Sequence, residues 1–337
     1  MILVMKTHTN ILIAMVGLAF LCGCSRNMGI LLRPVDVTEE LEETEVGGDE
    51  GWLVGPKVAI IDIDGVIANE RERDFFGAGE NPVSLFVEKL DKAEEDSAVK
   101  AVILRINSPG GGVTASDIMY QRLMRFRQRC RIPVVALIED VGASGGYYIA
   151  CGADKILAHP TSVTGSIGVI VQAISLADTL QMLGVETKAV TSGPMKDMGS
   201  LFKPLDKKDL AVFKTMIDAY YERFLDVVAR SRKSMDADKV RALADGRIYT
   251  GDQARKNGLV DDLGYMADAF EMAKVLSKTS RAKMVIYHRP YGYRANVYSS
   301  AVPAVPQINL INISADRLLA GSRPHFMYLW TGRGAGG

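Results

Sequence analysis

The sequence predicts an α/β fold with mostly parallel strands. Short apolar runs rich in β-branched residues alternate with amphipathic helical segments through the middle of the chain, and this alternation is typical of strands connected by helices. The chain of 337 residues is long enough for one large domain or two small ones with a substantial core. We find no internal repeat in it.

The first 23 residues have the features of an export leader. Lys6 supplies a positive charge, and residues 11–21 form an apolar core that is short for a membrane span. This core runs into Leu21-Cys22-Gly23-Cys24, which resembles a bacterial lipobox, cut before a cysteine that is then lipidated. We therefore expect a lipoprotein-type signal peptide over 1–23 and a lipid on Cys24, with an uncleaved anchor as the alternative. Either arrangement exports the body of the chain and tethers it to a membrane.

Residues 24–57 are expected to form an acidic flexible linker. Carboxylates gather around Gly47 and Gly48 with little apolar content, so the segment has little to bury. A solvated spacer is the simpler interpretation, and a specific acidic binding tail is the alternative. The carboxylates are Asp36, Glu39, Glu40, Glu42, Glu43, Glu45, Asp49 and Glu50.

The body of the chain, residues 58–289, carries the predicted strands. Each is an apolar run of strand length. Two of these runs are followed by glycine-rich turns, at 107–112 (NSPGGG) and 142–146 (GASGG). The predicted strands are 58–68, 101–106, 134–138, 155–158, 163–171 and 185–190. Residues 290–337 lose this periodicity, and we expect an irregular C-terminal tail there.

Four helices are predicted between the strands from end signals and apolar spacing. Asn81 and Pro82 supply an N-cap and a first-turn proline for a helix that continues to about residue 95. Thr250 and Gln253 have the capping-box pattern before a short helix. The two others are amphipathic, one with Met119, Leu123, Phe126 and Cys130 on a face, and one over 206–230 with Leu210, Phe213, Ile217, Tyr220, Phe224 and Val228.

Composition argues against several classes of function. Forty basic and forty acidic residues balance, and no basic patch is interleaved with aromatic residues, so we expect no nucleic-acid partner. Of four cysteines two lie in the leader, which rules out a disulfide scaffold. No Cys/His cluster suggests structural zinc, and we expect neither a metal nor another cofactor.

The stretch from Pro133 to Cys151 holds the candidate nucleophile. A buried strand is followed by Gly142-Ala143-Ser144-Gly145-Gly146 and then by residues that could open a helix. A serine at such a strand-to-helix turn has an exposed hydroxyl, and helix N–H groups lie nearby to hold an oxyanion. The alternative is a glycine-rich turn with an incidental serine, because G-x-S-x-G alone is a weak signal.

A serine nucleophile needs a base, and the sequence offers two kinds. The histidines outside the leader are His159, His288 and His325; His159 precedes Pro160 and has no obvious carboxylate to orient it, so it is more simply a turn residue. A lysine base must be neutral, which requires lowering an ordinary pKa of about 10.4 by burial.

Residues 192–198, SGPMKDM, could supply such a lysine at Lys196, with methionines as apolar neighbours. Asp197 argues against it because a nearby carboxylate favours the charged amine, although adjacent side chains of an extended segment point to opposite faces. A surface lysine is the alternative for Lys196.

Five ordered motifs resemble the signal peptide peptidase A family, which are membrane-tethered bacterial serine peptidases of the Clp protease/crotonase fold. The resemblance covers about 58–276 and is specific, because the motifs also have the family's spacing. They are NSPGGG (107–112), GASGGYY (142–148), TGSIGV (164–169), SGPMKDMGS (192–200) and GRIYTGDQARKNGLVDDLG (246–264).

The resemblance implies a fold of repeated β-β-α units and a Ser–Lys dyad. It implies Ser144 as the nucleophile, Lys196 as the general base, Ser166 as a hydrogen-bond partner of the lysine amine, and backbone N–H groups of Gly111 and Gly145 as the oxyanion hole. The chain is of the short, single-unit type, which implies a ring-shaped homo-oligomer with sites near subunit contacts.

These implications define the expected function. The chain is expected to be a serine endopeptidase of the bacterial cell envelope, with its peptidase domain outside the cytoplasm. Its expected substrates are remnant signal peptides or other membrane-associated peptides. Three features depart from the family pattern: His159 where a small polar residue is usual, Asp62 and Asp64 in the first strand, and the lipobox in place of an uncleaved anchor.

A competing hypothesis rests on residues 60–67, IIDIDGVI, which also resemble the first motif of haloacid dehalogenase-type phosphatases. Such enzymes use a strand-end D-x-D around Mg²⁺, and strand alternation would put Asp62 and Asp64 on one face. This reading leaves the glycine-rich motifs unexplained. A strand end with solvated carboxylates is the simplest interpretation of the pair.

Overall fold

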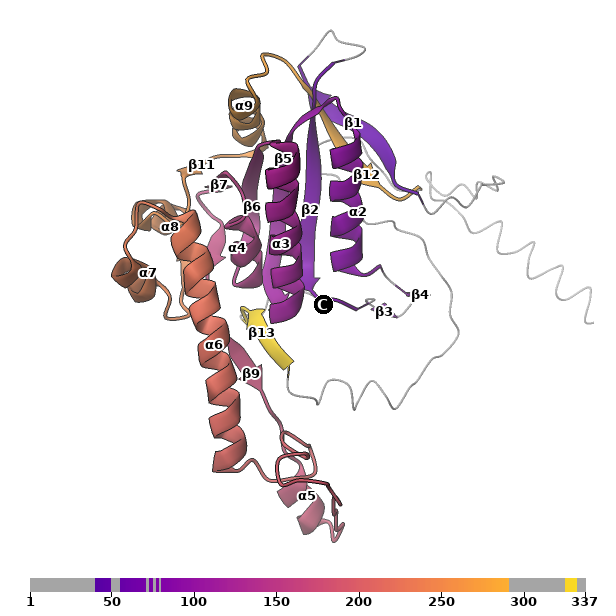
Figure 1. The fold of residues 1–337 in the computed structure, drawn as a ribbon, viewed down its shortest axis with the longest axis vertical. Coiled ribbons are helices and arrows are strands. Elements are labelled where there is room, and N and C mark those ends of the chain that lie inside the picture. The colour runs from indigo at the N-terminus through magenta and orange to yellow at the C-terminus, as the bar shows by residue number, and fades with distance from the viewer. Residues whose placement is uncertain are drawn as a thin grey trace, which may run out of the picture. The chain divides into compact units, whose positions relative to one another are not determined.

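The computed structural model describes residues 40–49, 55–70, 73–74, 77–78, 80–290 and 325–331. The expected signal peptide and Cys24 lie outside the described residues. Most of the described chain forms one α/β unit around an eleven-stranded sheet, whose main path is β1-β12-β2-β5-β6-β7-β11 (Figure 1). The predicted fold class is therefore confirmed.

Parallel strands form the centre of this sheet. They are β2 (Lys57–Ile67), β5 (Val99–Gly112), β6 (Val134–Ala143) and β7 (Lys155–Ala158), joined at the sides by β11 (Asp262–Leu263) and β12 (Lys283–His288). The middle strands are buried on both faces, which is why their sequences read as continuous apolar runs.

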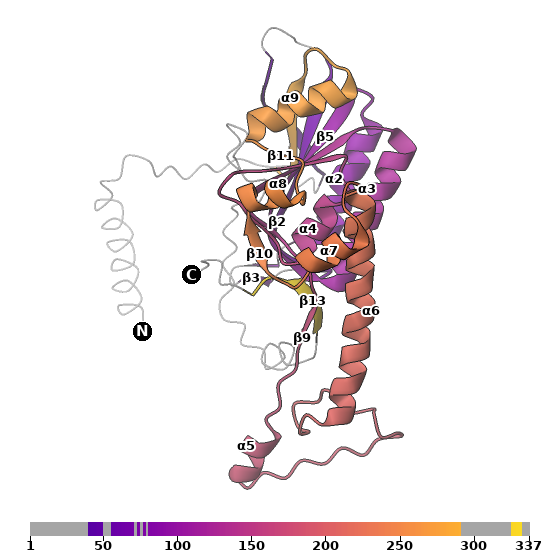
Figure 2. The same ribbon diagram turned by 90° about the vertical axis from the view of Figure 1, so that its left-hand side faces the viewer.

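Helices cover both faces of the sheet. Figure 2 shows α2 (Pro82–Glu95) and α3 (Val113–Cys130) on one side and α9 (Met266–Ser277) on the other. Alternate strand residues fill the two cores. For example, Val102 and Leu104 pack on the side of α2 and α3, and Ala101 and Ile103 pack on the side of α9.

Two predicted helix starts are confirmed in detail. The Asn81 side chain accepts hydrogen bonds from the N–H groups of Val83 and Ser84 at the start of α2. Thr250 and Gln253 form the predicted capping box at the start of α8 (Gly251–Asn257). Each signal acts within four residues of chain, so the local sequence is sufficient to predict it.

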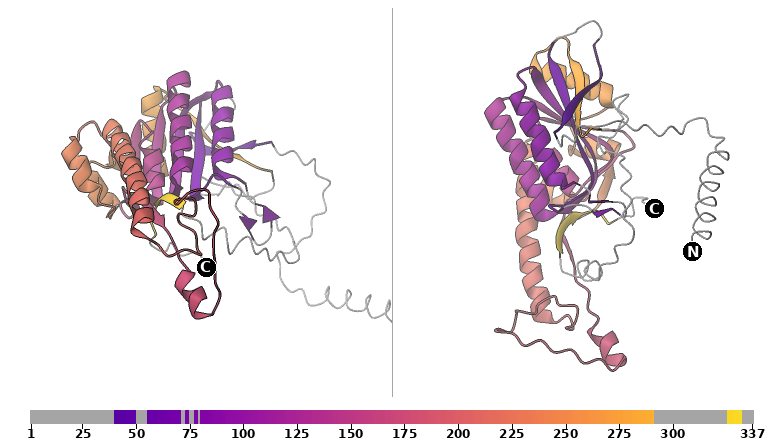
Figure 3. Two further views of the ribbon diagram at one scale, coloured as in Figure 1. Left: turned by 60° about the horizontal axis from the view of Figure 1, so that its bottom comes forward. Right: turned by 90° about the vertical axis from the view of Figure 1, so that its right-hand side faces the viewer.

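The long helix α6 (Lys207–Ser231) packs on the body mainly through its C-terminal half, although Phe213 nearer its start is also buried, against Phe326. Phe224, Leu225, Val227 and Val228 are buried in the C-terminal half, whereas Leu210 and Val212 near its start are exposed. Figure 3 shows that the start of α6 and the short helix α5 (Ala177–Met182) lie beyond the end of the sheet. We call residues 173–206, which carry α5, the arm. The remaining helix is α7 (Ala237–Leu243).

The predicted strand over 185–190 is wrong. These residues have no regular structure, and Val190 is 96% exposed, so the apolar run has no sheet to join. The predicted strand over 163–171 is two short strands, β8 (Val163–Gly165) and β9 (Ile170–Gln172). The break occurs where Gly165 and Ser166 both have positive φ, because that backbone geometry ends a strand.

The expected linker over 24–57 contains a strand near its end, β1 (Glu42–Gly48), which pairs antiparallel with β12. Val46 is buried, and two of the acidic side chains pair with lysines of the sheet, Glu43 with Lys57 and Glu45 with Lys283. The partners that hold this acidic strand at the sheet edge lie in β12, far from it in the sequence, and in β2, so its own residues do not predict it.

The expected tail over 290–337 also contains a strand, β13 (His325–Leu329). It pairs antiparallel with the end of β5 and with β9. The remaining strands are β10 (Ile248–Thr250), which pairs with β8, and the two-residue strands β3 (Arg73–Asp74) and β4 (Gly77–Ala78). Within the described ranges, none of the helices is long and apolar enough to cross a membrane.

Candidate active site

Ser144 lies in a strained turn between β6 and α4 (Gly145–Ala150). Its backbone has φ 51° and ψ −111°, a conformation that residues with a β-carbon rarely adopt. The turn is held on both sides, since the Ser144 N–H donates to the Gly165 carbonyl (2.8 Å) and the Tyr148 N–H donates to the Ser144 carbonyl (2.8 Å). Strain supported in this way is typical of a nucleophile at the start of a helix. Ser144 is only 1% exposed, so the prediction of an exposed hydroxyl is wrong for this chain by itself.

The two predicted oxyanion-hole glycines lie side by side at this turn. A β-carbon on Gly145 would be 3.1 Å from the Gly111 nitrogen and 2.4 Å from the Ser116 Oγ. A β-carbon on Gly111 would be 2.0 Å from the Ile67 carbonyl oxygen, so the loop at 107–112 is packed too closely for a side chain. This close packing brings two backbone N–H groups next to Ser144.

Ser166 is also brought to this turn. Ala143 pairs with Gly165 in the sheet, so Ser144 and Ser166 follow paired residues of neighbouring strands. Ser166 has φ 49°, is 7% exposed, and donates its N–H to the Arg247 carbonyl (2.8 Å). Four of the five predicted site residues are thus assembled within one subunit.

Lys196 is not part of this assembly. It lies in the arm, in a run of turns in which its N–H donates to the Gly193 carbonyl (3.1 Å), and its side chain is exposed. Within the described residues, its ammonium group makes no hydrogen bond or ion pair, with Ser144 or with any other side chain. The assignment of Lys196 as the base therefore stays a prediction.

The strand β13 lies against the glycine loop of this site, and the sequence did not predict it. β13 runs along the glycine loop, with Tyr328 opposite Gly111 and Leu329 opposite Gly110, and the Trp330 N–H donates to the Pro109 carbonyl (2.9 Å). Tyr328 is fully buried, stacked on Tyr148 with ring centroids 5.1 Å apart. The only signal in the sequence is the apolar run at 326–330, FMYLW, which is short and surrounded by tail residues without periodicity.

His159 has the surroundings of a turn residue. Its ring packs on Tyr265 (centroids 4.7 Å apart), and its Nε2 is buried without a hydrogen-bond partner among the described residues. Burial lowers the pKa of His159, so the ring is neutral at neutral pH. Its backbone closes a turn by accepting from the Ser162 N–H (3.0 Å).

Asp62 belongs to a buried charge cluster, whereas Asp64, two residues further along β2, is exposed. Asp62 accepts from the Arg105 Nε (2.7 Å) and lies 3.8 Å from the Lys89 ammonium, and all three side chains are almost fully buried. Loss of solvation beside this cluster, followed by the charge of Asp62, raises the pKa of Asp64 to about 6. Within the described ranges, no group of three or more His, Cys, Asp or Glu side chains could hold a metal ion. Nothing here supports the phosphatase hypothesis, and Asp62 is held by its arginine and lysine partners.

The fold and the Ser144 turn are those expected of an α/β enzyme with a serine at a strand-to-helix turn. Residues 127–280 match the model of peptidase family S49. A relative from Enterococcus faecium, named "Putative signal peptide peptidase SppA", is 38% identical over 246 residues, which are 73% of this chain and 71% of the relative. The chain belongs to peptidase family S49, the signal peptide peptidase A group, as the motifs predicted.

Other relatives differ in length. A protein of Haemophilus influenzae named "Protease 4" is 35% identical over 67% of this chain but only 36% of its own length. One solved structure, a variant of the 1510-N membrane-bound stomatin-specific protease, covers 66% of this chain and 86% of its own at 17% identity and a TM-score of 0.42. Family membership supports a serine peptidase.

Proposed function

We propose that this chain is a membrane-tethered serine endopeptidase that uses Ser144 as nucleophile and Lys196 as general base. Its proposed substrates are remnant signal peptides or other membrane-associated peptides. The observation that carries the proposal is the strained Ser144 turn, packed against Gly111 and Gly145, in a chain of family S49.

The proposed reaction follows from these positions. The Ser144 hydroxyl attacks the substrate carbonyl while Lys196 accepts its proton, and the carbonyl oxygen becomes an oxyanion held by the N–H groups of Gly111 and Gly145. Lys196 then donates the proton to the leaving amine as the peptide bond breaks, which leaves an ester on Ser144. Water then attacks this ester: Lys196 accepts a proton from the water and donates it to the Ser144 oxygen as the ester bond breaks, which releases the carboxylic acid product. Ser166 is proposed to orient the lysine amine.

The contacts of β13 support an extended peptide as the substrate. β13 pairs with the C-terminal end of β5 on one side and with β9 on the other. The backbone beside Ser144 can therefore accept an additional strand. Peptides are commonly bound in this way, with main-chain hydrogen bonds for affinity and pockets for alternate side chains. The buried position of Tyr328 among Tyr148 and Phe224 indicates that one such pocket is aromatic.

A ring-shaped homo-oligomer is proposed because the site is incomplete in one subunit. The arm carries Lys196 and exposes apolar side chains that a monomer would leave in water: Met182 (88%), Leu183 (73%), Val190 (96%) and Phe202 (50%). We propose that this surface packs on a second copy of the chain, where it brings Lys196 to the neighbour's Ser144. A head-to-tail contact of this kind closes into a ring.

Mixing two inactive variants tests this arrangement. Ser144→Ala and Lys196→Arg are each expected to be inactive, but their mixed oligomers are expected to regain about one quarter of wild-type activity, because random assortment pairs intact residues at that frequency. The measurement is hydrolysis of a peptide ester after the variants are dissociated and reassembled together. Mixtures that stay inactive, while wild-type subunits treated identically recover, would show that subunits do not share sites.

The membrane tether is proposed to be a lipid on Cys24, and the proposed location is the bacterial cell envelope with the peptidase domain outside the cytoplasm. Cys24→Ser is expected to leave an unprocessed or mislocalised precursor, since the lipid thioether requires that sulfur. Fractionation and mass spectrometry of the N-terminus measure this, with Cys22→Ser as the matched control. A mature wild-type protein that does not begin at a lipid-modified Cys24 would contradict it.

A further inference from the structure

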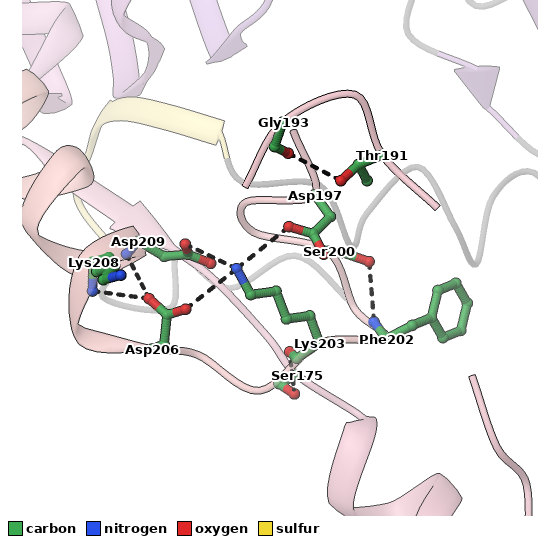
Figure 4. A network of polar contacts seen from close by, with 10 residues as sticks. All are labelled: Ser175, Thr191, Gly193, Asp197, Ser200, Phe202, Lys203, Asp206, Lys208 and Asp209. Atoms are coloured by element: carbon green, nitrogen blue, oxygen red, sulfur yellow. Dashed lines mark hydrogen bonds and ion pairs between the residues drawn. The ribbon is translucent and has the colours of Figure 1, made fainter. Parts of the chain in front are cut away.

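Lys203 joins the Lys196 loop to the start of α6. Its ammonium lies 3.4 Å from the Asp197 carboxylate, 3.3 Å from that of Asp206 and 3.1 Å from that of Asp209 (Figure 4). Asp197 is the residue next to Lys196, and the other two carboxylates lie at the start of the helix. The Lys203 ammonium therefore connects the loop that carries Lys196 to the start of helix α6.

The backbone around Lys203 is anchored from the opposite side of the arm. The Ser175 hydroxyl donates to the Lys203 carbonyl (2.8 Å), and the Leu176 N–H donates to the Leu201 carbonyl (2.7 Å). These partners carry no net charge, so they hold the backbone without adding an ion beside the ammonium. The Lys203 stem is thus fixed while its charged end reaches the three carboxylates.

The start of α6 makes the carboxylate group rigid. Asp206 is the N-cap and accepts from the N–H groups of Lys208 and Asp209, each at 2.8 Å. Asp209 is 1% exposed, and its Oδ2 has no hydrogen-bond partner among the described residues. A buried carboxylate left without its cation is costly, so Lys203 has a reason to stay in place.

Charge is the second consequence of this geometry. Three carboxylates and one ammonium leave a net negative cluster, and one of these carboxylates is adjacent in sequence to the proposed base. A negative charge near an amine favours its protonated form, which cannot accept a proton. Asp197 is the residue whose carboxylate would favour the charged form of Lys196. Lys203 offsets that carboxylate charge.

We propose that Lys203 is a positioning residue for Lys196: it fixes the loop through Asp197 and offsets the Asp197 charge so that Lys196 can act in its neutral form. The inference rests on Lys196 being the base. The charged groups that face Lys203 are Asp197 on its own loop and Asp206 and Asp209 at the start of α6. Residues 175–187 of the arm contribute only hydroxyl groups here, those of Ser175 and Thr187.

Lys203 is held in its charged form by its carboxylate partners. Hydrogen bonding to Asp209, before the other carboxylates, raises the pKa of Lys203, and the hydrogen bond from the Asp209 backbone lowers the pKa of Asp206. Lys203 therefore stays protonated in mildly alkaline solution. A rise of activity with pH in that range is not caused by Lys203 losing its proton.

The test compares rate–pH curves of full-length variants from about pH 6 to about pH 10, a range that spans ordinary histidine and lysine pKa values. Lys203→Gln is expected to move the alkaline limb of kcat/KM to higher pH by about half a unit or more, because the Asp197 charge is no longer offset. Lys203→Arg is expected to remain close to wild type. Asp197→Asn is expected to move the alkaline limb to lower pH. The double variant Lys203→Gln, Asp197→Asn is expected to return the limb toward the wild-type position.

Lys214→Gln is the matched control, because Lys214 pairs with Asp218 on an exposed face of the same helix. An equal loss of rate at every pH in Lys203→Gln, with no shift of the limb, would overturn the proposal. If Lys203→Gln does not fold, an unshifted limb in Asp197→Asn overturns it in the same way. Lys196→Arg is assayed in parallel: activity there refutes the dyad, whereas an inactive Lys196→Arg with an unshifted Lys203→Gln refutes only the role of Lys203.

Discussion

Ser144→Ala is expected to reduce peptide hydrolysis to less than about one hundredth of the wild-type rate, because the serine hydroxyl is the proposed attacking atom. The fold is expected to survive. The Ser144 side chain makes no hydrogen bond within the described residues, and both interactions that hold the turn come from its backbone. Alanine keeps the β-carbon, so the strain at φ 51° is unchanged.

Two measurements check this result. Hydrolysis of a peptide ester and labelling by a fluorophosphonate reagent should be lost together, whereas the free energy of unfolding should change by less than about 1 kcal/mol. Ser277→Ala is the control, since its hydroxyl bonds to the Ala273 carbonyl at the end of α9, on the other face of the sheet. Ser144→Ala activity above one hundredth of wild type, or labelling at a different serine, would refute the assignment.

Lys196→Arg is expected to abolish activity although it keeps the positive charge. Arginine stays protonated at every working pH, so it cannot take the proton of Ser144. The wild-type rate should rise through an alkaline limb, because a lysine base acts only after it has lost its own proton. A rate–pH profile of both proteins on one peptide ester measures this difference.

His159→Ala is the control that separates lysine from histidine chemistry, and only a minor loss is expected. Burial lowers the pKa of His159 below its ordinary value of about 6.5, so a reaction that used it as base would already be at full rate at neutral pH. A profile that levels off there, with activity lost in His159→Ala and kept in Lys196→Arg, would replace the lysine mechanism with a histidine one.

The elements that the sequence predicts well are those whose causes lie close together in the chain. The N-cap of α2 and the capping box of α8 each depend on residues within one helical turn, and both are present. The central strands are continuous apolar runs because both faces of the sheet are covered. The Ser144 turn belongs to the same group, since small residues on either side of a serine permit its positive φ and close packing.

The elements that the sequence predicts poorly depend on partners far along the chain. The acidic strand β1 is held by β12, more than two hundred residues away, and β13 is held by the glycine loop and β9. Conversely, the apolar run at 185–190 has strand composition but no strand to pair with. A strand requires a partner for its backbone groups, and composition alone does not supply one.

The family, the Ser144 turn and the glycines beside it were predictable from ordered motifs of small residues, because such motifs leave few alternatives for the backbone. Their surroundings depend on contacts between distant parts of the folded chain. The tertiary structure set Gly111 against Gly145, paired Asp62 with Arg105, and left Lys196 exposed on the arm with its neighbour Asp197 bound to Lys203. The physical reason is that close packing and ion pairing join side chains from separate elements, and the distances between those elements are not encoded in any one motif.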